Sequence, residues 1–250
     1  MTLLRREVEA NFDAFTADWK RSLPAAISAL DPHRDEYLRS YGRIASLNAW
    51  RGNLLDGRIS EGSLGFFGEA VNDAITAHVQ ARCGNWRSSL MSLRSCIENT
   101  CYCIFYKDHP VELALWELGK HRPGFSEILT YLKSHPDVAP LGNSTVTGIA
   151  MLEAEYGTLS RAVHASARGF RMSPDNQRTE LWKPEVALLG QWKTREIHTM
   201  NGLNLLLITI FRELLHGAQQ IGLRKALSFT ISAAQFPKIK SELHVTIIAA

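Results

Sequence analysis

Apolar residues recur at three- and four-residue spacing along most of the chain, which is the pattern of amphipathic α-helices. The first predicted helix covers residues 3–30, and Pro24 is expected to bend or end it. Its apolar positions are Leu4, Val8, Phe12, Phe15 and Trp19. Further helices are predicted at residues 34–55, 63–83 with Ser63 as cap, 86–107, 111–119, 126–133, 147–168 and 184–217, with an allowed interruption near Asn201 and Gly202.

The order of these elements indicates an all-α fold. No strand alternates with a helix in a βαβ manner, and the chain has neither an internal repeat nor a heptad seam. Only the weak alternation of residues 229–250 leaves room for a short strand. We therefore expect an antiparallel helical bundle at 61–222, an N-terminal helical extension at 1–60 and a C-terminal tail at 223–250.

Composition limits the classes of function. The 250 residues include 28 Lys and Arg against 25 Asp and Glu, and a net charge of +3 is too small for nucleic-acid binding by bulk electrostatics. Any site for a polyanion must be local. Charged residues from Arg5 onward do not fit a secretory leader, and the apolar run Leu203–Phe211 is too short to span a membrane. We expect a cytoplasmic protein without a membrane segment.

The motifs do not indicate a metal or cofactor. Four cysteines, without a C-x-x-C pair or a histidine at ligand spacing, are expected to be reduced core thiols: Cys83, Cys96, Cys101 and Cys103. His109, His121 and His135 are too scattered to predict a metal site. The phosphate-binding loops, the zinc-protease motif and the nucleophile elbow are all absent.

A local cationic segment lies at residues 156–174, which contain no carboxylate but carry Arg161, His164, Arg168 and Arg171. In a helix, Arg161, His164 and Arg168 share one face, and such a face suits a phosphate. The alternative is a solvated surface or a set of intramolecular ion pairs.

A second charged face is predicted on the helix at 86–107, where Arg87, Arg94 and Glu98 fall on one side. Arg94 and Glu98 are spaced for an ion pair that stabilises the rim of the core. In the functional interpretation this pair faces His164, Glu98 orients the imidazole and Arg94 binds a phosphate.

Two segments, residues 87–112 and 158–166, resemble bacterial HEPN-like helical proteins, some of which are encoded with phage-defence or toxin–antitoxin genes. The matching positions are Arg94, Ser95, Glu98, the aromatic run Tyr102–Tyr106, the corner Asp108–Glu112 and the element Ser160–His164. The resemblance implies a helical bundle that forms homo-oligomers or hetero-complexes.

The nuclease members of that group cleave RNA without metal, using an Arg and a His separated by four to six residues. Arg161 and His164 are separated by two residues, and Arg212 and His216 by three, so the strict motif is absent. The favoured function is an accessory or binding subunit of a defence-type complex, with Arg87, Arg161, Arg168 and Arg171 as nucleic-acid contacts. The alternative is a metal-independent ribonuclease that uses His164 with Arg161 or Arg94, and with Glu98.

Overall fold

The computed structural model describes residues 2–164 and 181–249, and within these ranges the chain is helical and has no β-strand. Short 3₁₀ segments and one π segment join the helices, which are α1 (Leu3–Leu30), α2 (Arg34–Trp50), α3 (Glu61–Arg82), α4 (Trp86–Asp108), α5 (Pro110–Glu117), α6 (Phe125–Ser134), α7 (Ile149–Val163), α8 (Val186–Phe211), α9 (Ile221–Ala226) and α10 (Phe236–Leu243). The prediction of an all-α fold is confirmed.

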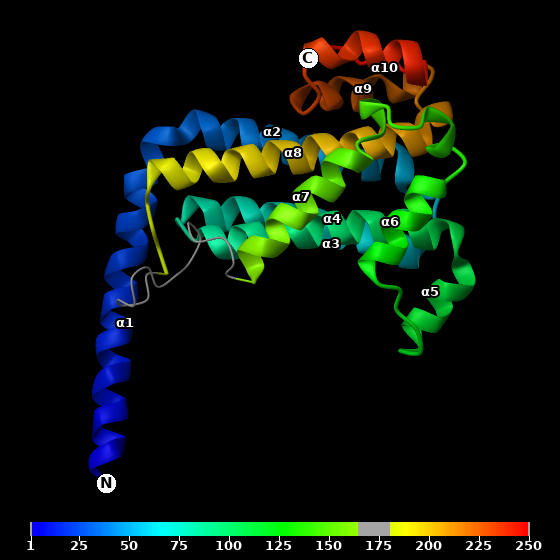
Figure 1. Ribbon diagram of the computed structural model, residues 1–250. Coiled ribbons are helices and arrows are strands. Elements are labelled where there is room, and N and C mark those ends of the chain that lie inside the picture. The colour runs from blue at the N-terminus through cyan, green and yellow to red at the C-terminus, as the bar shows by residue number, and fades with distance from the viewer. Residues whose placement is uncertain (1, 165–180, 250) are drawn as a thin grey trace.

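Four long helices, α2, α3, α4 and α8, lie side by side and form the body of the molecule (Figure 1). Helix α7 packs against α4 and α8, while α5 and α6 cover one end of the body. Side chains without exposed surface fill the space between these helices, among them Trp50, Phe67, Ile97 and Trp192. Burying such apolar side chains is the main contribution to folding.

Helices α7 and α8 approach closely at two glycines. The sequence allowed an interruption at Gly202, but α8 is continuous there. A Cβ atom at Gly202 would lie 2.8 Å from the side chain of Leu152 on α7. Gly148 has a φ of +70°, and a Cβ atom there would lie 2.3 Å from the carbonyl oxygen of Gly202. Gly202 is therefore required by packing and does not break the helix.

Several boundaries differ from the prediction for local reasons. Helix α3 begins at Glu61 because the Ser60 hydroxyl accepts a hydrogen bond from the Ser63 amide, so Ser60 and not Ser63 is the cap. Helix α7 ends at Val163, before the predicted end at residue 168. The described tail forms α9 and α10, and the short strand allowed there is absent from residues 223–249.

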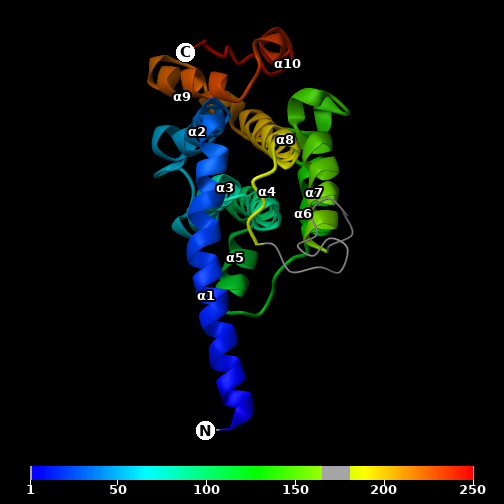
Figure 2. The ribbon, with the colours of Figure 1, turned by 90° about the vertical axis from the view of Figure 1, so that its left-hand side faces the viewer.

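Helix α1 extends away from the body of the molecule (Figures 1 and 2). It continues through Pro24, and the turn around Lys20 is exposed, so water can bind the carbonyl that loses its amide donor. Its buried residues are Ala26 and Leu30, both near its C-terminal end. Helix α2 belongs to the bundle, so α1 is the projecting part of the extension expected at residues 1–60.

Candidate functional site

The charged pair predicted on α4 meets α7 in a shared polar network. Arg94 Nη2 lies 2.9 Å from Glu98 Oε1, which confirms that these residues pair. Arg94 Nε also donates a 3.1 Å hydrogen bond to Ser160 Oγ, and the Tyr156 hydroxyl donates a 2.8 Å bond to Glu98 Oε1. Arg94 donates a further bond to the Tyr156 hydroxyl. The network therefore ties α4 to α7.

The contacts in this network hold α4 and α7 together. Burial raises the pKa of Tyr156, and its hydrogen bond to Glu98 raises it further, so the phenol stays protonated and serves as a donor. Arg94 is engaged by Glu98, Tyr156 and Ser160 together. A phosphate would have to compete with these contacts for the guanidinium.

The other predicted site residues lie around the C-terminal end of α7. Arg87 Nη2 donates a 2.7 Å hydrogen bond to the Val163 carbonyl oxygen, and this bond joins α4 to the last turn of α7. Arg161 is exposed and donates a 3.2 Å bond to Thr158 Oγ1. His164 is exposed immediately after the helix, and its amide donates a 3.0 Å bond to the Ser160 carbonyl oxygen.

The geometry brings Arg87 and Arg94 to the helix that carries Arg161 and precedes His164. The hydrogen bonds of Glu98 in the described chain run to Arg94 and Tyr156, so its predicted role in orienting His164 stays a prediction. Arg168 and Arg171 lie outside the described residues. A helix C-terminus carries partial negative charge, which works against an anion bound at the same point.

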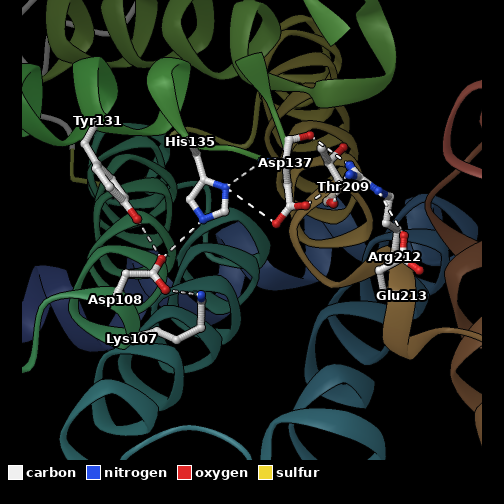
Figure 3. Close-up of polar contacts among 8 residues, drawn as sticks. All are labelled: Lys107, Asp108, Tyr131, His135, Asp137, Thr209, Arg212 and Glu213. Carbon is white, nitrogen blue, oxygen red and sulfur yellow. Dashed lines mark hydrogen bonds and ion pairs between the residues drawn. The ribbon is translucent and has the colours of Figure 1, made fainter. Parts of the chain in front are cut away.

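A second polar cluster was not predicted and joins the ends of α4, α6 and α8 (Figure 3). His135 is almost fully buried, with its Nε2 atom 3.3 Å from Asp108 Oδ2. Its Nδ1 atom accepts a 3.1 Å hydrogen bond from the Asp137 amide. The Tyr131 hydroxyl donates a 2.7 Å bond to Asp108 Oδ2, and Lys107 pairs with the same carboxylate.

Both nitrogens of His135 are committed in this arrangement. Nδ1 accepts from the Asp137 amide and lies 3.6 Å from Asp137 Oδ2, while Nε2 faces the Asp108 carboxylate. Burial tends to raise the pKa of Asp108, but hydrogen bonds from Lys107 and Tyr131 hold it below its usual value, so the carboxylate stays charged. The contacts of both nitrogens tie the His135 ring to Asp108 and Asp137, and the cluster fixes the loop after α6.

Arg212 extends the cluster to the end of α8 (Figure 3). Its Nη1 atom donates a 2.8 Å hydrogen bond to the Asp137 carbonyl oxygen, and its Nη2 atom lies 3.0 Å from Asp137 Oδ1. Sequence reasoning treated His135 as an isolated loop histidine, and the only local signal was a Pro and an Asp directly after it. Asp108, the partner of His135, and Arg212, the partner of Asp137, are distant in the chain, so spacing could not reveal them.

Two further ion pairs connect α8 to neighbouring helices. Arg43 on α2 pairs with Glu196, and only 2% of the Glu196 side chain is exposed. Glu155 on α7 pairs with Arg195 at 3.1 Å and lies 3.3 Å from His198 Nδ1. Burial raises the pKa of Glu155 even though these neighbours favour its charged form. Each pair connects helices that are distant in the sequence.

The described residues contain no group of His, Cys, Asp and Glu side chains that could hold a metal ion. Cys96, Cys101 and Cys103 are free and buried, as expected of core thiols, and burial raises the pKa of Cys103 to about 12. Cys83 is also free but only partly buried, at the C-terminal end of α3, so the prediction of a core thiol is wrong there. Such thiols are poor nucleophiles at neutral pH. In the same part of the chain, no helix is long and apolar enough to cross a membrane.

Helix α1 carries an apolar face that is exposed to solvent. One face carries large apolar side chains with exposed fractions of 43–69%, namely Leu4, Val8, Phe12, Phe15 and Trp19. At about 100° per residue these five positions fall within an arc of about 80°. We call this face the α1 stripe.

Neither protein-family models nor curated proteins nor solved structures give a match to this chain. The helical class is confirmed, but the resemblance to HEPN-like proteins stays a prediction.

Proposed function

We propose that this protein is an accessory binding subunit that assembles through α1. The observation that carries the proposal is the α1 stripe. A contiguous apolar face on a projecting helix costs solvation free energy unless another surface covers it, and such faces are typical of interaction sites. The resemblance to HEPN-like proteins supports the same kind of function, with the bundle contacting a protein or nucleoprotein of a defence-type complex.

The charges of α1 favour a protein partner over a lipid or nucleic-acid surface. Interfacial helices and nucleic-acid contacts need an excess of Lys and Arg on the polar face. The polar face of α1 is instead balanced, because its four basic side chains are matched by four acidic ones: Arg5, Arg6, Lys20 and Arg21 against Glu7, Glu9, Asp13 and Asp18.

The spacing of the α1 stripe fits a second copy of the chain in antiparallel orientation. With two such helices centred near Phe12, Leu4 of one copy lies opposite Trp19 of the other, and Val8 lies opposite Phe15. Small side chains then face large ones, which fills space evenly. Arg5 also lies level with Asp18. A parallel pair would place Trp19 against Trp19 and leave the Leu4 end loosely packed.

Ribonuclease activity is the alternative, and the polar network between α4 and α7 argues against it. Arg94 already has three side-chain partners, and Arg161 and His164 lie at a helix end whose dipole opposes anion binding. Total RNA incubated with the protein in EDTA should stay intact. Cleavage that disappears in His164→Ala would support the nuclease instead.

Light scattering of the purified chain tests the assembly. We expect a dimer for the native chain and a monomer for Phe15→Glu, because a charge within the α1 stripe would be buried without a partner. Ala17→Glu is the matched control, since Ala17 is exposed on the opposite face of the helix and its variant should remain dimeric.

Disulfide trapping tests the orientation. Phe12→Cys should crosslink to itself, and Leu4→Cys should crosslink to Trp19→Cys but not to itself. Self-crosslinking of Leu4→Cys would indicate a parallel pair. A native chain that is monomeric at all concentrations, or a Phe15→Glu variant that stays dimeric, would overturn the assembly through α1.

A further inference from the structure

A pocket of about 400 Å³ lies where the turn between α1 and α2 meets the C-terminal end of α3. Asp31 lines it from the turn, and His78 and Arg82 line it from the last turns of α3. The α2 side is formed by residues at helical spacing, which share one face: Arg34, Tyr37, Leu38 and Tyr41. The pocket has the size of a small-molecule site.

The walls of the pocket are largely aromatic and apolar. Tyr37 is buried, and its hydroxyl donates a 3.3 Å hydrogen bond to the Ala81 carbonyl oxygen. The His78 ring makes edge contacts with two tyrosines, and its centroid lies 5.8 Å from that of Tyr37 and 6.2 Å from that of Tyr41. Tyr41 and Leu38 are mostly exposed, so a ligand in the pocket would cover apolar surface that now faces water.

His78 is held in place from the side of α2. Ser40 is fully buried, and its Oγ atom lies 3.0 Å from His78 Nδ1. Burial lowers the pKa of His78 to about 4, so its ring is neutral at pH 7 and adds no charge to the pocket. The positive charge of the pocket therefore comes from its two arginines.

The two arginines differ in how firmly they are held. Arg82 Nη2 lies 3.0 Å from Asp31 Oδ1, and its guanidinium carbon is 5.6 Å from the centroid of the Tyr37 ring. The Arg34 side chain is 76% exposed and makes a long contact of 3.8 Å with Asp35, which is also exposed. An exposed pair at this distance is weak, so Arg34 can turn its donors toward an anion in the pocket.

The charges of the lining favour an anion with a single charge. Arg34 and Arg82 against Asp31 leave one excess positive charge among the lining residues at neutral pH. A phosphate monoester carries about −1.5 to −2 at pH 7, which exceeds this excess and would be repelled by Asp31. A carboxylate carries one negative charge, and its two oxygens match the fork of a guanidinium.

We infer that this pocket binds a small monocarboxylic acid. The carboxylate lies toward Arg34 and Arg82, and the apolar body of the ligand packs against Leu38 and Tyr41. Aromatic and aliphatic acids share this chemistry. The inference goes beyond assembly through α1, because the pocket lies at the C-terminal end of that helix and the α1 stripe ends at Trp19.

Substitutions of exposed side chains can test the pocket without disturbing the core. Arg34→Gln removes the charge but keeps a polar side chain, and Tyr41→Ala removes part of the apolar wall. Arg39→Gln is the matched control for the charge. Arg39 lies on the same helix, is exposed and pairs with Glu36 at 2.8 Å outside the lining of the pocket.

Isothermal titration calorimetry of the full chain at pH 7 with 3-phenylpropionate, hexanoate and the neutral 3-phenylpropionamide measures the site. We expect at least one of the two acids to bind, and the amide to bind about tenfold more weakly than 3-phenylpropionate because it lacks the charge. Arg34→Gln and Tyr41→Ala should each weaken binding of the acid by about tenfold. Arg39→Gln should bind as the native chain does.

The outcomes separate the two kinds of acid and can overturn the site. Tighter binding of 3-phenylpropionate assigns the pocket to aromatic acids, and tighter binding of hexanoate assigns it to aliphatic ones. A native chain that binds neither acid overturns the inference, as does an amide that binds as well as 3-phenylpropionate. Equal weakening in Arg34→Gln and Arg39→Gln would also overturn it, because it would reduce binding to the general charge of the surface. Phenyl phosphate that binds more tightly than both acids would contradict the choice of a carboxylate.

Discussion

Arg43 Nε donates a 2.6 Å hydrogen bond to Glu196 Oε2, and the pair lies buried between α2 and α8. Burial raises the pKa of Glu196 to about 6, although the Arg43 charge and its hydrogen bonds act to lower it. The cost of desolvating both charges is thus only partly offset by their attraction. The pair specifies how two helices distant in the chain pack together.

Removing one partner of this pair should destabilise the fold strongly. Arg43→Leu or Glu196→Leu leaves the other group buried without its partner, and each should lower the free energy of unfolding by about 3–5 kcal/mol. The double variant Arg43→Leu/Glu196→Leu should cost less than the two single changes added together. Urea unfolding gives the three values, and strict additivity would show that the two groups do not interact.

His78 should make stability depend on pH. Burial lowers its pKa to about 4, and Ser40 Oγ lies 3.0 Å from its Nδ1 atom. The unfolded imidazole binds a proton at a pKa of about 6.5, so the stabilising contribution is present above that pH and is lost as pH falls toward 4. Glu196 acts in the opposite sense, because its raised pKa makes its contribution fall as pH rises from about 4.5 to 6.

Comparing the native chain with His78→Asn separates the pH effect of His78 from that of Glu196. Between about pH 7 and pH 4.5 the native chain should lose more of its free energy of unfolding than the variant does, since both retain Glu196. Urea unfolding at each pH measures this difference. Parallel pH profiles for the two proteins would contradict the role assigned to His78.

Periodicity alone was enough to predict the helices from α1 to α8, because their apolar faces repeat within a few residues. The short helices α9 and α10 lie in the tail, where the weak alternation had left room for a strand. Spacing likewise predicted the Arg94–Glu98 pair, which lies within one helix. The partners Tyr156 and Ser160 come from a separate helix, and no local pattern encodes a contact between distant segments. Gly202 was misread for the same reason, since a glycine that breaks a helix and one that admits Leu152 look identical in sequence.

Two glycines with positive φ separate backbone strain from close packing. Gly119 has a φ of +68°, close to that of Gly148, and a Cβ atom there would meet nothing within 4 Å, so Gly119→Ala should cost about 1–2 kcal/mol from strain alone. Gly148→Ala adds a contact of 2.3 Å with the Gly202 carbonyl oxygen and should cost clearly more. Thermal unfolding of both variants checks the order, and equal losses would show that the approach of α7 to α8 is not tight.

Substitutions in and beside the network between α4 and α7 should distinguish residues that stabilise the fold from exposed residues that do not. Arg94→Ala leaves Glu98 and Tyr156 without their cationic partner and should lower the free energy of unfolding by about 1–3 kcal/mol. Arg161→Ala and His164→Ala change exposed side chains and should stay within about 0.5 kcal/mol. Chemical unfolding of the three variants measures these differences.

Tyr156→Phe is the control that shows whether the hydrogen bonds or the packing of Arg94 cause the loss of stability in Arg94→Ala. It removes the hydroxyl that joins Arg94 to Glu98 but keeps the ring, whose centroid lies 4.0 Å from that of Phe125. A loss of about 1 kcal/mol would assign the stability to the hydrogen bonds, whereas no loss would assign it to the packing of Arg94. A large loss in Arg161→Ala or His164→Ala would instead place these residues in the scaffold, and the predicted site roles of Arg161 and His164 would lose their basis.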